Sequence, residues 1–104
     1  MLIDGNKARQ ELLEAGEDWA DKNAAAQLLE DTKSSFLSEL IQGIIKADPK
    51  CSFAKAESEA KAEPDYQNHI NKMVEARRVA NKAKVRLDAA KALLEIRLCN
   101  AARS

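Results

Sequence analysis

The amino-acid sequence predicts an all-α protein built around a long antiparallel helical hairpin, which we expect to pair into a dimeric helical bundle. Its 104 residues include only three glycines, two prolines and 4% aromatic side chains, a composition that argues against a β sandwich or barrel. Ala, Leu, Lys, Arg and Glu favour helices and dominate residues 64–103. A helix of that length must pack lengthwise against another helix.

Residues 1–16 are expected to form an N-terminal arm containing one short helix. Asp4 or Asn6 can cap its beginning. Gly16 stands where a helix end favours a residue that tolerates positive φ, so it predicts a break. A bend at Gly16 in place of a full break stays open at this point.

The first long helix is predicted over residues 18–47, with Asp18 as its N-cap and Asp48-Pro49 as its end. Its apolar residues form two stripes. The first stripe comprises Ala26, Leu29, Phe36, Leu40 and Ile44, and the second comprises Leu37, Ile41 and Ile45. A helix that is apolar on two faces must be covered on two sides. The C-terminal helix covers one side, and the arm, the middle segment or a second subunit covers the other.

Residues 48–63 predict a turn followed by a short connector helix. Ser52 can cap this helix, and Phe53 is its only large apolar residue. Because large apolar residues are so few, we expect a solvated connector with little core contact.

The second long helix is predicted over residues 64–103, with Pro64 at its first position. Its main seam comprises Met73, Ala76, Ala80, Ala83, Leu87, Ala90, Leu94, Leu98 and Ala101. A weaker stripe on another side comprises Val74, Val85, Ala89, Ala92 and Ile96. This second stripe predicts self-association as a dimer, because a single hairpin would leave its apolar side chains exposed to water. The expected self-association residues are Phe36, Leu37, Leu40, Ile41, Ile44, Ile45, Leu87, Leu94 and Leu98.

The net charge of zero conceals a partition along the chain. Residues 1–68 hold 14 acidic and 8 basic side chains, whereas residues 69–104 hold 9 basic and 3 acidic ones. The basic excess indicates either a surface for DNA or another acidic partner, or an attraction between the acidic and basic helices of the fold. The candidate contacts for such a partner are Arg77, Lys84 and Lys91 in one row, with Arg86 and Arg97 on the other flank. No aromatic residues alternate with them, so stacking on single-stranded bases is unsupported.

The sequence offers no catalytic, metal-binding or cofactor-binding motif. His69 is the only histidine, and a packed or surface role explains it better than general-base catalysis. Cys51 and Cys99 fit neither a disulfide framework nor a zinc site. With no apolar run long enough for a membrane span and no signal-peptide pattern, we expect a cytoplasmic protein that is not an enzyme.

Three segments resemble a group of short helical proteins of tailed bacteriophages and prophages. The matching residues are Glu30, Asp31, Lys33 and Ser34; Pro64 and Tyr66; and Arg97, Ala101 and Arg103. The sequence departs from that pattern where Ile96 and Leu98 replace a Trp and a Ser. The resemblance implies a gene setting near recombination and single-strand annealing functions, and residence in the host cytoplasm. It implies no activity.

Three functions follow as expectations. The first is a non-catalytic phage accessory protein that acts through protein contacts in DNA recombination or replication, with weak DNA contact in one version. The second is a small inhibitor of a host nuclease, helicase or defence complex. The third is a structural dimerisation or scaffold module.

Overall fold

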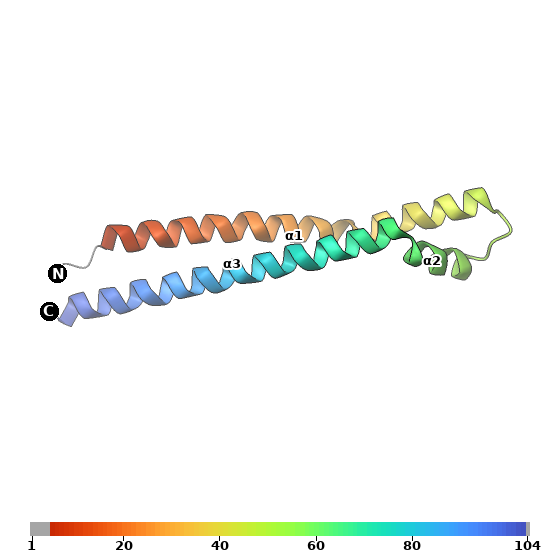
Figure 1. The fold of residues 1–104 in the computed structure, drawn as a ribbon. Helices are drawn as coiled ribbons and strands as arrows, with labels where there is room; N and C mark the ends of the chain where they lie inside the picture. Colours follow the sequence, from red (N-terminus) through yellow and green to blue (C-terminus); the bar gives the residue numbers. More distant parts are fainter. Residues whose placement is uncertain (1–4, 104) are drawn as a thin grey trace. The chain divides into compact units, whose positions relative to one another are not determined.

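The computed structural model describes residues 5–103 as three α-helices: α1 (Gly5–Ala47), α2 (Phe53–Ala62) and α3 (Pro64–Arg103) (Figure 1). No strand occurs within this described range. The chain divides into two compact units, residues 1–25 with 76–104 and residues 26–75. In each unit a segment of α1 runs antiparallel to a segment of α3, which confirms the all-α helical hairpin.

α1 continues without interruption through Gly16, so the predicted boundary between an arm and a helix starting at residue 18 is wrong. Gly16 does not have positive φ, and Asp18 lies inside the helix and does not cap it. The physical reason is tertiary packing. Ala8 is buried and Trp19 is half-buried on the same face, so favourable contacts on both sides outweigh the cost of one helical glycine. Of the two predicted caps, Asn6 is already helical and Asp4 lies outside the described residues.

The other helix ends are where the sequence predicts them. α1 ends at Ala47, directly before Asp48-Pro49. The backbone N–H of Lys55 donates to Ser52 Oγ over 3.2 Å, which confirms Ser52 as the cap of α2. Pro64 is the first residue of α3, where its missing N–H costs nothing.

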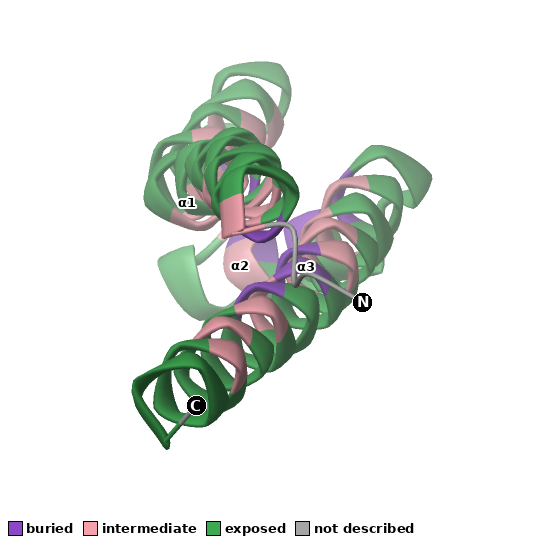
Figure 2. Cartoon of the chain, turned by 90° about the vertical axis from the view of Figure 1, so that its left-hand side faces the viewer, coloured by how far each residue is buried: buried purple, intermediate pink, exposed green. Residues whose placement is uncertain are grey.

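In the unit of residues 1–25 and 76–104, the core consists largely of small side chains. Ala80, Ala83 and Leu87 of α3 are buried, while Ala90 and Leu94 are half-buried, which confirms the centre of the predicted seam (Figure 2). These positions alternate by three and four residues, the seven-residue spacing of a helix that packs along a partner helix. The far end of the seam differs from prediction, because Leu98 and Ala101 are exposed.

In the unit of residues 26–75, α2 covers the apolar end of α1. Ile41, Ala56 and Ala60 form a buried cluster. Partly buried side chains packed against it are Leu37, Leu40, Ile44, Ile45 and Cys51. Of the open alternatives, the middle segment therefore covers these residues of α1.

The expectation of a solvated connector is wrong. Ala56 and Ala60 of α2 are fully buried, whereas Phe53 is 62% exposed. Small side chains let two helices approach closely, so an alanine face can be a packing face. Counting only large apolar residues therefore underestimates how strongly α2 is held.

Candidate functional site

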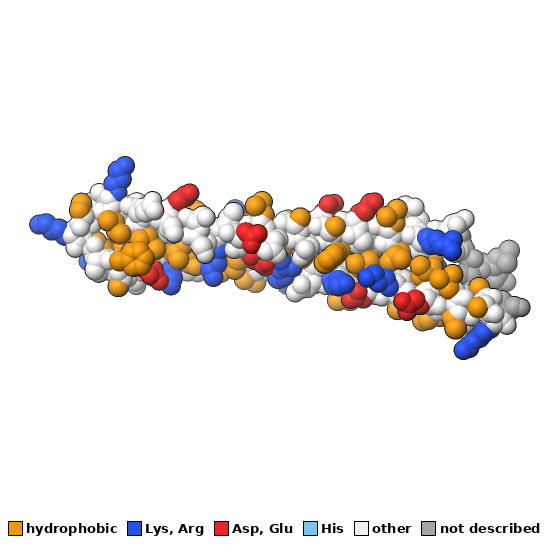
Figure 3. Space-filling view, turned by 180° about the vertical axis from the view of Figure 1, so that it is seen from behind, with side chains coloured by type: hydrophobic (Ala, Val, Ile, Leu, Met, Phe, Trp, Pro, Cys, Tyr) orange, Lys and Arg blue, Asp and Glu red, His pale blue; other side chains and the backbone are white. Residues whose placement is uncertain are grey.

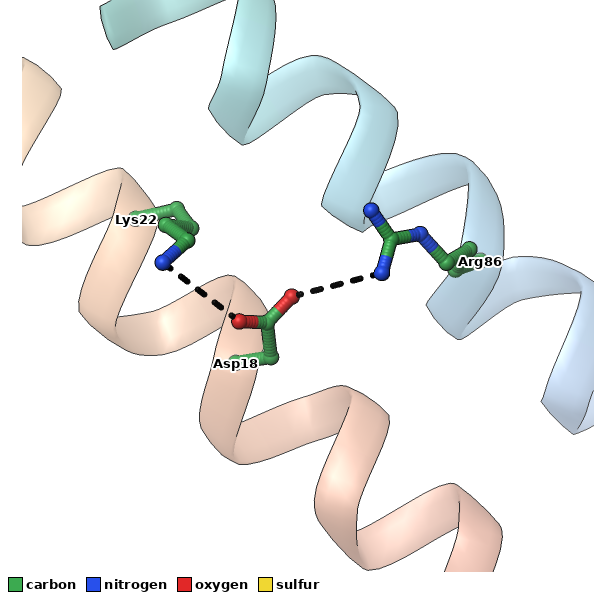
Figure 4. Close-up of polar contacts among 3 residues, drawn as sticks. All are labelled: Asp18, Lys22 and Arg86. Atoms are coloured by element: carbon green, nitrogen blue, oxygen red, sulfur yellow. Dashed lines mark ion pairs between the residues drawn. The ribbon is translucent and has the colours of Figure 1, made fainter.

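Asp18 of α1 joins two cations in the unit of residues 1–25 and 76–104 (Figure 4). Its carboxylate lies 3.8 Å from Lys22 Nζ, one helical turn away, and 4.0 Å from Arg86 Nη1 of α3. The Asp18 side chain is 39% exposed and that of Arg86 is 73% exposed, so water screens both pairs. Beside them is a shallow depression of about 300 Å³. It is lined by Glu11, Glu14, Ala15, Asp18 and Arg86.

Two further basic residues of α3 contact α1 in the same unit. Arg77 Nη1 donates to Asn23 Oδ1 over 2.9 Å, and both residues are half-buried. Lys84 Nζ lies 5.3 Å from the centroid of the Trp19 ring and 3.1 Å from Asp88 Oδ1. Arg77, Lys84 and Arg86 thus contact side chains of their own unit, and the pair of Arg86 with Asp18 joins a basic residue of α3 to an acidic residue of α1.

The other predicted basic contacts lie apart from these. Lys91 is exposed and has no ion pair within residues 5–103, and Arg97 is half-buried. The five candidate cations do not converge on one binding site. Sequence reasoning missed Trp19 and Asn23 as their partners, although both continue the helical spacing of Ala15 and Ala26.

His69 is a packed histidine in the unit of residues 26–75. Its ring stacks on Phe36 with centroids 5.1 Å apart and an interplanar angle of 19°. His69 Nε2 lies 3.0 Å from the Leu29 carbonyl oxygen; because a carbonyl only accepts, this nitrogen carries the proton. A shallow depression of about 350 Å³ adjoins the stack. It is lined by Leu29, Phe36, Asp65, Asn68, His69 and Lys72. The contacts explain His69 as a structural residue.

An ion pair within α2 shifts the pKa of a lysine. Lys61 Nζ donates to Glu57 Oε1 over 2.9 Å, and this hydrogen bond, together with the carboxylate charge, raises the pKa of Lys61. A raised lysine pKa means that the contribution to stability is present at neutral pH. It is lost only as the pH rises through that raised value.

Most of the predicted self-association residues lie inside the fold. Ile41 and Leu87 are buried, and Phe36 and Leu94 are half-buried. Of the α3 members of that set, Leu98 is the exposed one, at 48%. The residues expected to bind a second copy are therefore largely engaged within the chain.

The weaker stripe of α3, in contrast, is exposed to solvent. Val85 is 68% exposed and Ile96 is 57% exposed, on the side of α3 away from the seam. We call this stretch the outer face. It comprises Val85, Ala89, Ala92, Ile96 and Cys99, all of them exposed. Figure 3 shows the mixture of hydrophobic and charged side chains on the surface of the molecule. Single exposed apolar residues are ordinary, but a row at helical spacing is typical of an interaction surface.

Within residues 5–103, no group of three or more His, Cys, Asp or Glu side chains is placed to hold a metal ion. In the same range, no helix has both the length and the apolar character that crossing a membrane requires. The chain matches no protein-family model, no curated protein and no solved structure.

Proposed function

We propose that this protein is a non-catalytic interaction module that binds a protein partner through the outer face of α3. One observation carries the proposal: α3 packs against α1 through its alanine seam while a second row of apolar side chains, from Val85 to Cys99, stays exposed. Helical partners are commonly bound through apolar rows of this spacing.

The setting that we propose is DNA recombination or replication in a phage-infected cell. The resemblance of three sequence segments to phage helical proteins supports this setting. A direct contact with DNA has weaker support, because Arg77, Lys84 and Arg86 already contact side chains of their own unit.

Affinity capture from a host lysate tests the module. The bait proteins are the wild type, the outer-face variant Ile96→Asp and the control Leu13→Asp. Leu13 is 56% exposed, which matches Ile96, but it lies on α1 and so outside the outer face. We expect a captured protein that the wild type and Leu13→Asp retain and Ile96→Asp loses. A captured protein that all three baits retain would count against the outer face. Capture of a nuclease, helicase or defence complex would favour the inhibitor version.

A mobility-shift titration at low salt tests the DNA version. Replacement of Arg77, Lys84 and Lys91 by Gln removes one row of cations, and we expect loss of any salt-dependent shift. No shift by the wild type at low salt would remove DNA contact from the proposal.

A second candidate is a dimerisation or scaffold module, which the exposed outer face also favours. This candidate predicts a stable dimer in sedimentation equilibrium at micromolar concentration, converted to monomer by Ile96→Asp. A wild-type monomer would exclude it.

A further inference from the structure

We infer that α2 is a flap, which opens from α1 by itself while α1 and α3 stay paired. Opening uncovers Ile41, a large apolar side chain that is 6% exposed when α2 is in place. The half-buried Leu37 and Ile45 adjoin Ile41, so the open form presents an apolar stripe that the closed form covers. This inference is independent of the proposed function, which concerns the outer face of α3.

The contact that holds α2 in place is small. α2 has ten residues, of which Ala56 and Ala60 are buried, Glu57 is half-buried and the others are exposed. Each buried alanine contributes one methyl group to the contact with α1. A helix shorter than about 12 residues is only marginally stable on its own in water, so α2 depends on this contact. Elements with few buried apolar contacts open at a lower free energy than the whole fold.

The helical backbone is interrupted at both ends of α2. Residues 48–52 form a turn before it, and Glu63 after it is extended, with φ −63° and ψ 138°. α2 can therefore move without unwinding either long helix. One side chain ties α2 to α3, because Gln67 Nε2 donates to the Lys61 carbonyl oxygen over 2.8 Å. This hydrogen bond is exposed, so water replaces it at little cost when α2 opens.

The pairing of α1 with α3 does not depend on α2. The described members of the apolar cluster beneath α2 all lie between Leu37 and Ala60, so none of them belongs to α3. In the same unit, α3 contacts α1 through His69, which stacks on Phe36 and lies 3.0 Å from the Leu29 carbonyl oxygen. These contacts remain when α2 opens.

Hydrogen exchange of the backbone amides of the full-length protein, followed by NMR, tests the flap. Amides of residues 57–62 report on α2, and amides of residues 70–75 report on α3 in the same unit. We expect protection factors at least about tenfold lower in α2, because its opening does not require α3 to unfold. Exchange in α2 should also depend more weakly on urea, because flap opening exposes less surface than unfolding of the hairpin.

Two variants separate flap opening from unfolding of the hairpin. His69→Ala removes contacts between α1 and α3, so the α3 amides should exchange about tenfold faster, while the α2 amides keep the wild-type rate. Ser52→Ala is the comparison, because it removes the cap of α2 and should speed exchange of the α2 amides about fivefold. Circular dichroism of both variants checks that the helices remain.

Three results would overturn the inference. They are protection in α2 that equals or exceeds that in α3, equal acceleration of both sets of amides by His69→Ala, and unchanged exchange in α2 after loss of the Ser52 cap. If His69→Ala does not fold, the wild-type protection factors and their urea dependence decide between flap opening and all-or-none unfolding.

Discussion

At the scale of single residues, Gly16 shows how tertiary packing decides a local conformation. A Cβ added at Gly16 would lie 3.8 Å from Leu87 Cδ1, which is an ordinary van der Waals contact. Because helical glycine costs about 0.5–1 kcal/mol relative to alanine, Gly16→Ala should raise the free energy of unfolding by roughly that amount. Urea denaturation followed by circular dichroism measures it.

Gly43→Ala is the matched comparison for that prediction. A Cβ at Gly43 has no atom within 4 Å, so this variant reports the helical effect alone. A loss of stability in Gly16→Ala together with a gain in Gly43→Ala would indicate a break at Gly16 in solution.

The stack of His69 on Phe36 gives a second prediction at this scale. His69→Ala removes the stack and the hydrogen bond to the Leu29 carbonyl. We expect a loss of about 1–2 kcal/mol in the free energy of unfolding, since each contact contributes about 1 kcal/mol. His69→Phe should recover the greater part of the lost unfolding free energy, because it retains the ring stack and leaves the Leu29 carbonyl within α1. Equal losses in both variants would assign the stability to the hydrogen bond.

At the scale of elements, α2 is held by its alanines. Ala60 is fully buried against the end of α1, whereas Ala54 is exposed on the same helix. Ala60→Leu overfills the contact and should cost about 1–3 kcal/mol of unfolding free energy, while Ala54→Leu stays within about 0.5 kcal/mol of the wild type. Thermal denaturation of the two variants makes the comparison. Similar melting temperatures would mean that α2 is not packed on α1.

The sequence predicts the helices better than it predicts what they contact. Proline and a capping serine are local signals, so the end of α1, the start of α2 and the start of α3 follow from Pro49, Ser52 and Pro64 alone. Burial of α2 depends on residues that are distant in sequence. The identity of an alanine does not indicate whether it faces another helix or water. The contacts of Asp18 and Trp19 with α3 likewise required the register of two helices, which no local pattern specifies.

At the scale of the whole molecule, the exposed ion pair of Asp18 with Arg86 joins the acidic and basic parts of the chain. Arg86→Gln removes this pair, in which the two side chains lie 4.0 Å apart, and should cost less than about 1 kcal/mol of unfolding free energy. The cost should shrink further between about 0.01 and 0.3 M NaCl as salt screens the charges. Melting curves of wild type and variant at both salt concentrations show it. A cost that salt leaves unchanged would point to lost packing of the arginine stem.

The alanine-rich core has a calorimetric consequence. Within residues 5–103, no large side chain is fully buried, so unfolding exposes little apolar surface for each residue. Heat capacity change and denaturant m-value both scale with that surface. The chain should therefore unfold with broad thermal and denaturant transitions for its length. A partner bound along α3 would make the unfolding transition sharper.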